Sequence, residues 1–358
     1  MAIAAKFEID YVQYMDAEGR LVRDDLPEFA RDLDHMVELY KLMVSTRIFD
    51  AKSVAMQRTG KLGTYASCLG QEATQVGVGS AMRPEDVLSL SYREYGAQLY
   101  RGVQPREVYT YWGGDERGND YQQEPARHDF AWSVPIATQC LHAAGAALAF
   151  KIRNEPRVAV CCVGDGGTSK GDFYGAINMA GAQQLPLVAV IINNQWAISL
   201  PRHQQTGART LAQKGIAAGL YSVQVDGNDI IAVRAVVEEA IERARNGQGG
   251  SVIEAVTYRL SDHTTVDDAR RYRATEEVTE AWTREPVKRL RAWLESQGVW
   301  DEAREQAWQT ECDEWMDSEV NAYLQTVAPE TGAMFDYTFA ELPVDLARQR
   351  QSAIDREH

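Results

Sequence analysis

The feature that most constrains the fold is a set of short, continuous apolar runs in the middle of the chain, interspersed with helical patterns. The runs are RVAVCCVGD (157–165), LPLVAVIINN (185–194), YSVQVDG (221–227) and SVIEAVTYRL (251–260). The helical patterns span residues 136–154, 172–184 and 229–247. A strand that helices cover on both faces is apolar throughout, whereas a half-exposed strand alternates apolar and polar residues. We therefore predict an α/β fold with a doubly wound, mostly parallel sheet.

The rest of the chain is helical or irregular in pattern. Residues 1–60 are expected to form an N-terminal arm and a helix that runs from Phe29 to near Gly60. Residues 61–274 would form the α/β domain, and residues 275–358, which are charged and punctuated by tryptophan, would form a C-terminal helical extension. A chain of 358 residues with 45% hydrophobic content can bury the core of one large domain with extensions.

Composition excludes several classes of partner. Acidic residues number 52 against 37 basic ones, and without a basic patch such a chain repels the phosphate backbone of nucleic acids. The start, MAIAAKFEID, is no cleavable signal, and no apolar run approaches the length of a membrane span, so we expect a cytoplasmic protein without membrane contact. The five cysteines lack zinc-site spacing and are expected to be reduced and structural.

Two of the predicted strands end in residues that suit an anion and a cation. Gly164, Gly166 and Gly167 let the backbone approach an anion closely, and the helix that follows offers free N–H groups, which predicts a diphosphate cradle. Asp165 would repel that anion unless a divalent ion such as Mg²⁺ lay between them, and Asn194 ends the next strand at the same edge of the sheet. Taken singly, such residues are more often helix caps or turn residues, but the pair is more specific.

The whole segment from GDGG to Asn-Asn resembles the signature of thiamine-diphosphate-dependent enzymes. Over about residues 35–345 the chain resembles the alpha subunit of the decarboxylating component of 2-oxo acid dehydrogenase complexes, of pyruvate and branched-chain types alike. The matching blocks are GQEATQVGVG, SYREYGAQLYRG, SVPIATQ, GDGGTSKGDFYGAINMAGA, INNQWAISLP, VDGNDIIAV, TYRLSDHTTVDDARRYR and RLRAWLESQGVWDE. The resemblance implies the thiamine-diphosphate-binding fold.

The resemblance also implies roles for individual residues. Mg²⁺ would be bound by the side chains of Asp165 and Asn194 and by the backbone carbonyl of Trp196. The diphosphate would be held by a tyrosine and two arginines: Tyr92, Arg93 and Arg259. The aminopyrimidine ring would lie against Ile136 and the backbone of Val134. In some branched-chain relatives the same segment wraps a monovalent cation such as K⁺, for which the candidates here are Ser133, Thr138 and Gln139.

His263 is the candidate catalytic residue. The resemblance places its imidazole at the diphosphate and the incoming substrate, where it would handle a proton or orient a lipoyl group. Without that frame, His263 would be a loop residue that caps the turn DHTT. The chain also departs from some family members: Tyr95 replaces a histidine, and the loop with Thr264 lacks the serines that are phosphorylated in animal relatives, so we predict neither an extra base nor kinase control.

The resemblance implies decarboxylation of a 2-oxo acid on thiamine diphosphate and transfer of the acyl group to a lipoyl group on the acyltransferase of the complex. The blocks GDGGTSKGDFYGAINMAGA and TLAQKGIAAG favour pyruvate, whereas SVPIATQ, SYREYGAQLYRG and RLRAWLESQGVWDE lean towards a branched-chain substrate such as 3-methyl-2-oxobutanoate. An acetoin dehydrogenase alpha subunit and a non-catalytic scaffold are further alternatives. A Rossmann dehydrogenase would need G-x-G-x-x-G, which GDGGTSKG does not supply in frame.

We expect the chain to act in an α₂β₂ heterotetramer with a separate beta subunit. Thiamine enzymes need a second α/β domain, but only residues 157–262 show alternating strands, which also disfavours a transketolase-like homodimer. The small-residue helix HAAGAALA either approaches the partner closely at Gly145 or packs on its own sheet.

Overall fold

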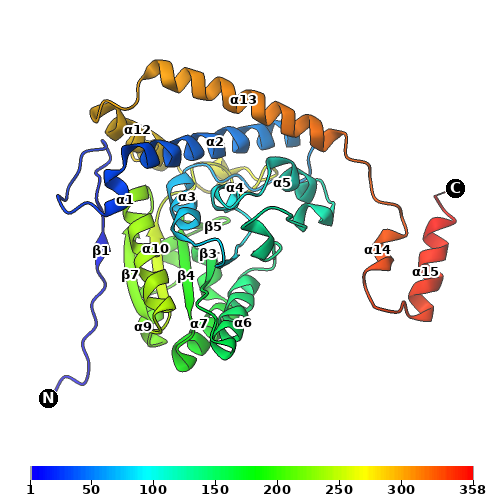
Figure 1. Cartoon of the computed structure of the whole chain (residues 1–358), viewed down its shortest axis with the longest axis horizontal. Coiled ribbons are helices and arrows are strands. Elements are labelled where there is room, and N and C mark those ends of the chain that lie inside the picture. Colours follow the sequence, from blue (N-terminus) through cyan, green and yellow to red (C-terminus); the bar gives the residue numbers. More distant parts are fainter. Residues whose placement is uncertain (1, 358) are drawn as a thin grey trace.

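The computed structural model describes residues 2–357 and is built around a six-stranded sheet (Figure 1). The strands are β1 (Tyr11–Val12), β2 (Val87–Ser89), β3 (Ala159–Gly164), β4 (Leu187–Asn193), β7 (Tyr221–Asp226) and β8 (Ser251–Val256). They lie in the order β1-β7-β8-β4-β3-β2, and every neighbouring pair is parallel. The predicted parallel sheet is confirmed.

Helices cover both faces of the sheet, which explains why β3 and β4 are apolar at nearly every position. The helices α3 (Glu72–Ala81) and α10 (Ile230–Arg245) share a core with one face, and α6 (Thr138–Arg153) and α7 (Gly171–Gln183) share a core with the other. Because strand residues alternate in direction, the adjacent residues Cys161 and Cys162 point into different cores. All five cysteines are free and buried, as predicted.

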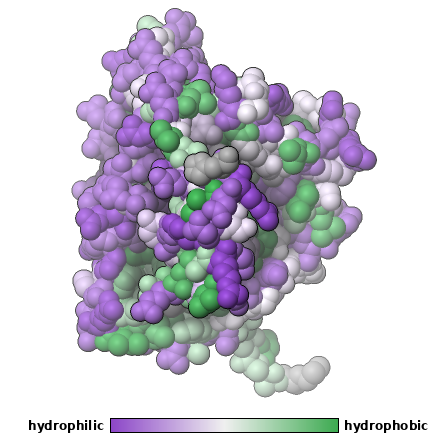
Figure 2. Space-filling view, turned by 90° about the vertical axis from the view of Figure 1, so that its right-hand side faces the viewer, coloured by the Kyte–Doolittle hydropathy of each residue, from purple (hydrophilic) through white to green (hydrophobic). Residues whose placement is uncertain are grey.

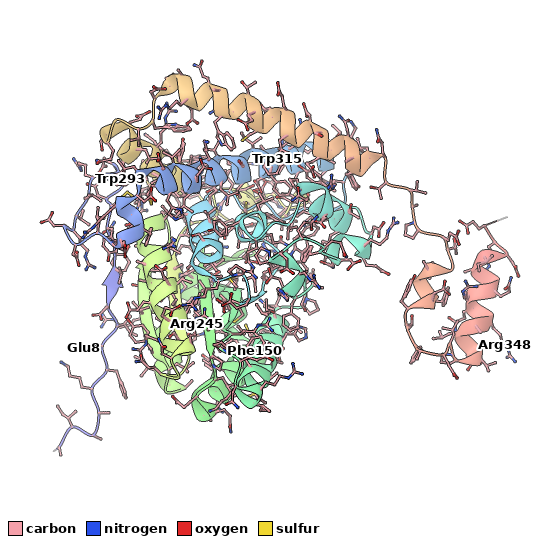
Figure 3. The ribbon with its side chains drawn as sticks, in the orientation of Figure 1. Glu8, Phe150, Arg245, Trp293, Trp315 and Arg348 are labelled. Carbon is pink, nitrogen blue, oxygen red and sulfur yellow. The ribbon has the colours of Figure 1, made fainter. Side chains whose placement is uncertain are left out.

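The N- and C-terminal extensions form a helical layer over one end of the α/β domain (Figure 1). Its helices are α1 (Glu28–Arg31), α2 (Leu33–Arg58), α11 (Thr275–Trp282), α12 (Pro286–Ser296) and α13 (Glu302–Leu324). The long helix α2 begins after Asp32, whose carboxylate accepts a hydrogen bond from the N–H of His35, and it ends before Gly60. Both α12 and α13 pack along α2, with Trp293 fully buried and Trp315 partly buried in that layer (Figure 3).

The last two helices, α14 (Ala333–Asp336) and α15 (Val344–Ile354), pack on each other away from the main body (Figure 1). Arg350 and Asp336 form an ion pair of 2.6 Å between them. On the face towards this tail, hydrophobic residues gather in small patches among hydrophilic ones (Figure 2). Among residues 2–357, no helix is both long and apolar enough to cross a bilayer.

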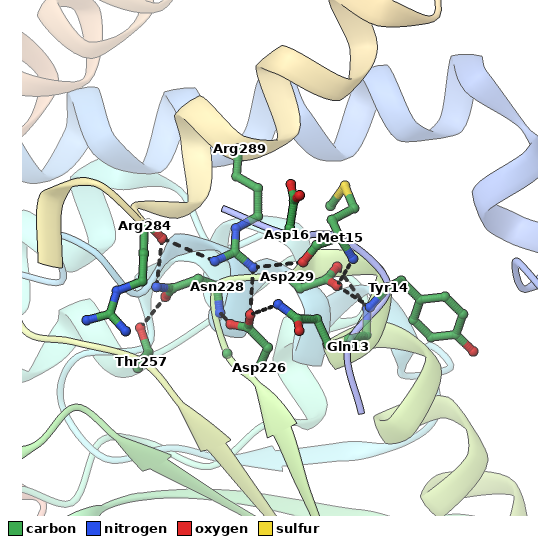
Figure 4. Close-up of polar contacts among 12 residues, drawn as sticks. Gln13, Tyr14, Met15, Asp16, Asp226, Asn228, Asp229, Thr257, Arg284 and Arg289 are labelled. Atoms are coloured by element: carbon green, nitrogen blue, oxygen red, sulfur yellow. Dashed lines mark hydrogen bonds and ion pairs between the residues drawn. The ribbon is translucent and has the colours of Figure 1, made fainter. Parts of the chain in front are cut away.

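The N-terminal arm adds the edge strand β1 to the sheet. The backbone N–H groups of Tyr14 and Met15 donate hydrogen bonds of 2.6 and 2.7 Å to Asp229, which is also the N-cap of α10 (Figure 4). Beside it, Arg289 of α12 pairs with Asp226 at 2.7 Å. Two buried carboxylates therefore tie the arm and the C-terminal extension to the α/β domain.

Short elements connect the main ones. They are α4 (Tyr95–Tyr100), α5 (Pro105–Trp112), β5 (Trp196–Ala197), β6 (Leu200–Pro201), α8 (Arg202–Gln205), α9 (Gln213–Ala217) and the 3₁₀ helices η1 (Glu116–Asn119), η2 (Ala126–His128), η3 (Asp165–Ser169) and η4 (Ala269–Arg271). The sequence pattern missed β1 and β2, because each pairs over two or three residues only.

Candidate active site

A cavity of about 350 Å³ lies at the carboxyl ends of β3 and β4, where ligands bind in open α/β sheets. Its wall contains most of the residues expected from the sequence: Tyr92, Arg93, Ile136, Gly164, Asp165, Gly166, Gly167, Asn194, Trp196 and His263. Segments from five separate parts of the chain therefore meet at one point. Val134 and Arg259 are the expected residues that do not reach the cavity surface.

Neighbouring side chains pack closely against two glycines of the GDGG turn. A Cβ atom on Gly166 would lie 2.5 Å from the Cβ of Ala197, and one on Gly167 would lie 2.5 Å from Val163 Cγ2. A Cβ on Gly164 would meet nothing within 4 Å. Gly166 and Gly167 are thus required by packing, while Gly164 leaves open space beside the first residue of η3.

The two predicted metal-ligating side chains lie in the same cavity wall. Asp165 is 2% exposed, and burial raises the pKa of its carboxyl. Its Oδ2 accepts a hydrogen bond of 2.6 Å from Gln205 Nε2. Asn194 Oδ1 accepts the N–H of Trp196 at 3.3 Å, so its Nδ2 faces Gln71 Oε1 at 3.4 Å. The orientation of the Asn194 amide is therefore fixed by the backbone.

Arg93 and Arg259 converge on His263. Arg93 Nη2 lies 3.3 Å from His263 Nδ1 and 3.0 Å from its carbonyl, and Arg259 Nη1 lies 3.3 Å from the same Nδ1. Burial first, and then the two guanidinium groups, lower the pKa of His263 to about 3. Since guanidinium groups only donate, Nδ1 must accept, and the proton of the neutral imidazole is on Nε2.

Arg259 lies behind the cavity surface and is fully buried. Its guanidinium donates to the carbonyls of Trp196 and Ile198, at 3.3 and 2.8 Å, and to the hydroxyl of Tyr272 at 3.0 Å. Ile198 has a φ of 55°, which is strained for a β-branched residue. In this structure Arg259 therefore fixes the turn that carries the Trp196 carbonyl, rather than facing the cavity.

The segment that precedes α6 is divided between cavity and surface. Ile136 lines the cavity, and Val134 is 44% exposed outside it. The amide of Gln139 donates to the carbonyl of Cys162 at 2.9 Å, while its Oε1 is buried without a hydrogen-bond partner. Thr138 is the first residue of α6. Among the three candidates for a monovalent cation, Gln139 is the one whose buried oxygen has no hydrogen-bond partner.

Several cavity residues were given no role from the sequence: Gln71, Ser91, Glu94, Lys170 and Ile198. Glu94 is 3% exposed, and burial raises its pKa. Tyr95, noted above as a departure, is fully buried and donates its hydroxyl to the carbonyls of Ala66 and Tyr92. The block GQEATQVGVG was a signal for Gln71, but its pattern did not show which side chain faces the cavity.

The polar groups of the cavity fit a ligand that carries a metal and an anion. Gln71 Nε2 and Gln139 Oε1 are buried without partners, although both residues line the cavity. Among residues 2–357 there is no cluster of three or more His, Cys, Asp or Glu side chains that could hold a metal alone. A metal bound by Asp165 and Asn194 would therefore need further oxygen atoms from a ligand, such as a diphosphate.

Residues 40–330 match the family described as the dehydrogenase E1 component, and the chain belongs to that family. The 3-methyl-2-oxobutanoate dehydrogenase subunit alpha of Mycobacterium tuberculosis is 40% identical over 349 residues, which cover 96% of this chain and 93% of the relative. The pyruvate dehydrogenase E1 component subunit alpha of Staphylococcus epidermidis is 37% identical, covering 99% and 94%. That of Acholeplasma laidlawii is 38% identical, covering 93% and 96%. The resemblance found in the sequence is confirmed, and a Rossmann dehydrogenase is excluded.

Proposed function

We propose that this chain is the alpha subunit of a thiamine-diphosphate-dependent 2-oxo acid dehydrogenase and supplies the diphosphate and metal half of its active site. The observation that carries the proposal is the meeting of Asp165, Asn194, Arg93 and His263 in one cavity. Relatives named as alpha subunits of pyruvate dehydrogenase and of 3-methyl-2-oxobutanoate dehydrogenase match nearly the whole chain, and this match supports the proposed function.

The residues present fit thiamine diphosphate with Mg²⁺. Asp165, Asn194 and the carbonyl of Trp196 would hold the metal, and Tyr92 and Arg93 would hold the diphosphate. Arg93 would supply the positive charge that pairs with the diphosphate, since this residue lines the cavity. Arg259 would act on the diphosphate only if its hydrogen bonds to the carbonyls of Trp196 and Ile198 were exchanged for others. When bound, the cofactor supplies a nucleophilic carbon and an electron sink for the loss of CO₂.

His263 would hold a proton on Nε2 at the substrate end of the site. A bound anion offsets the positive field of Arg93 and Arg259, and it therefore raises the pKa of the imidazole from its low value in the free chain. The loaded site would therefore favour a proton on His263 more than the free chain does. Ile136 and Ile198, which also line the cavity, would exclude water from the reacting atoms.

A K⁺ site formed by Ser133, Thr138 and Gln139 is part of the proposal. The unpartnered Oε1 of Gln139 supports it, because a buried amide oxygen needs a donor or a cation. We also propose a cytoplasmic location, for which the acidic composition and the reduced cysteines are the support.

A beta subunit would complete the site in an α₂β₂ assembly. Ile136 and Ile198 are 42% and 56% exposed at the cavity, and Val134 is exposed nearby. On α6, Ala143, Ala144 and Ala147 are buried against the sheet, whereas Leu141 and Gly145 are exposed. The small-residue helix therefore packs on its own sheet by one face and offers the other to a partner. A lipoyl domain of the acyltransferase would be the acceptor of the acyl group.

We propose pyruvate as the substrate, with a branched-chain 2-oxo acid as the second candidate. The second candidate is favoured by the 40% identity to the mycobacterial relative, against 37% for the staphylococcal one. The test is an assay of the chain with its beta subunit and the matching lipoyl domain on a panel of 2-oxo acids. Higher kcat/KM for pyruvate supports the first candidate, and higher kcat/KM for 3-methyl-2-oxobutanoate supports the second.

A further inference from the structure

A loop that follows the Asn-Asn turn places a glutamine directly on the predicted metal-ligating carboxylate. Asp165 receives its side-chain hydrogen bond from Gln205, at 2.6 Å between Gln205 Nε2 and Asp165 Oδ2. Within residues 2–357, no basic side chain forms an ion pair with this carboxylate. The Gln205 amide is therefore the group that sets how this buried carboxylate faces the cavity.

The loop holds Gln205 in place by contacts at both of its ends. At the start, β5 pairs with β6, and the N–H of Arg202 donates to the carbonyl of Gln195 at 2.8 Å. At the end, the N–H groups of Leu211 and Ala212 donate to the buried carboxylate of Glu254 at 2.7 and 3.1 Å. Between these anchors, α8 packs on η3, the element that begins with Asp165.

The amide of Gln205 has a second, unused group at the same position. Its Oε1 is buried and has no hydrogen-bond partner. A buried amide oxygen without a partner is costly, so this oxygen would be stabilised by a hydrogen-bond donor next to Asp165. One amide thus holds the carboxylate by its N–H and offers an acceptor by its oxygen.

We propose that Gln205 is a positioning residue for the metal. By holding Oδ2 of Asp165 it leaves Oδ1 as the ligating atom, so that the carboxylate binds the metal through one oxygen in a fixed direction. Residues that orient a metal ligand typically change the metal affinity 10- to 100-fold when they are removed. The inference rests on the proposed function, because it needs Asp165 to be a metal ligand.

The test uses the chain together with its beta subunit and thiamine diphosphate, with Mn²⁺ as a spectroscopic probe in place of Mg²⁺. Electron paramagnetic resonance measures free and bound Mn²⁺, and we expect Gln205→Met to raise the Mn²⁺ Kd by about 10- to 100-fold. Activity of this variant should recover at high metal concentration, since a purely structural defect would not be rescued. Gln204→Met is the matched control, because Gln204 is exposed on the same helix and its side-chain hydrogen bond is to the ring of His203 rather than to Asp165.

Two further variants separate the possible failures. If Asp165→Ala leaves Mn²⁺ binding intact, the proposed metal site itself is wrong. If Asp165→Ala abolishes tight binding while Gln205→Met binds Mn²⁺ as well as the unmodified protein, the role of Gln205 is refuted. In the Asp165→Ala background, adding Gln205→Met should change the residual affinity little, because Gln205 acts through that carboxylate. A full additional loss in the double variant would also overturn the inference.

Discussion

The two guanidinium groups around His263 predict how the stability of the chain depends on pH. In the unfolded chain a histidine titrates near 6.5, whereas burial and the neighbouring Arg93 and Arg259 lower the pKa of His263 to about 3 in the folded chain. Below pH 6.5 the unfolded state therefore takes up a proton that the folded state does not. The folded state loses stability as the pH falls from 6.5 towards 3, at up to about 1.4 kcal/mol per pH unit.

The magnitude follows from the two pKa values. Between about pH 8 and about pH 5, His263 should cost the folded chain about 2 kcal/mol, and any folded-state pKa below about 4 gives nearly the same figure. His263→Gln removes the titration but keeps a polar side chain. Urea unfolding of the isolated alpha chain at both pH values measures the effect as a difference between the two proteins, in which all other titrating groups cancel. An identical pH dependence of the two proteins would show that His263 titrates normally, and it would refute the reasoning about its charge and tautomer.

Three other predictions concern an ion pair, a glycine in the GDGG turn and the candidate catalytic histidine. Arg101→Met should destabilise the chain by about 3 to 5 kcal/mol, because Arg101 and Asp129 form a buried ion pair with hydrogen bonds of 2.6 and 2.8 Å. The control is Arg106→Met, which breaks an ion pair whose arginine is half exposed and should cost at most about 1 kcal/mol. If urea unfolding gave equal costs for the two variants, the prediction would be wrong. Gly166→Ala should destabilise the chain by about 1 to 3 kcal/mol and lower its Tm, since the new Cβ would lie 2.5 Å from the Cβ of Ala197. In the control Gly171→Ala the new Cβ would meet nothing within 4 Å, so the Tm should not fall. Equal Tm values for the two variants would contradict this prediction. His263→Ala should keep most of the cofactor affinity in calorimetry yet lose acyl transfer to the lipoyl domain, and unchanged turnover would return His263 to a structural role.

The parts of the fold that the sequence predicted are those with strong, local patterns. The strands β3 and β4 are apolar on both faces, so their runs and the intervening α7 were recognisable without any tertiary information. The edge strands were not recognisable, because β1 and β2 are too short for a pattern and exist only through pairing with β7 and β3. Asp229, which binds the arm and caps α10 at once, is an example of a contact that only the folded chain reveals.

The candidate site divides in a similar way. Gly164 ends β3, and Asp165 and Asn194 follow β3 and β4, so their placement at one edge of the sheet follows from the parallel topology. Arg259 was expected to hold the diphosphate, but in the structure its guanidinium donates hydrogen bonds to the carbonyls of Trp196 and Ile198. The sequence could not predict this, because the rotamer and the hydrogen-bond partners of a side chain leave no pattern in the sequence. Gln205 was overlooked for a related reason, since a loop brings it to Asp165 across 40 positions of sequence.

The central claim is that the cavity at the ends of β3 and β4 binds thiamine diphosphate through a divalent metal. Calorimetric titration of thiamine diphosphate into the chain assembled with its beta subunit, with Mg²⁺ and with excess chelator, tests it most directly. Because Asp165 would face the diphosphate as a like charge, we expect tight binding with Mg²⁺ only, and loss of that binding in the Asp165→Ala, Asn194→Ala double variant. Equal affinity in chelator, or tight binding by the double variant, would contradict the account.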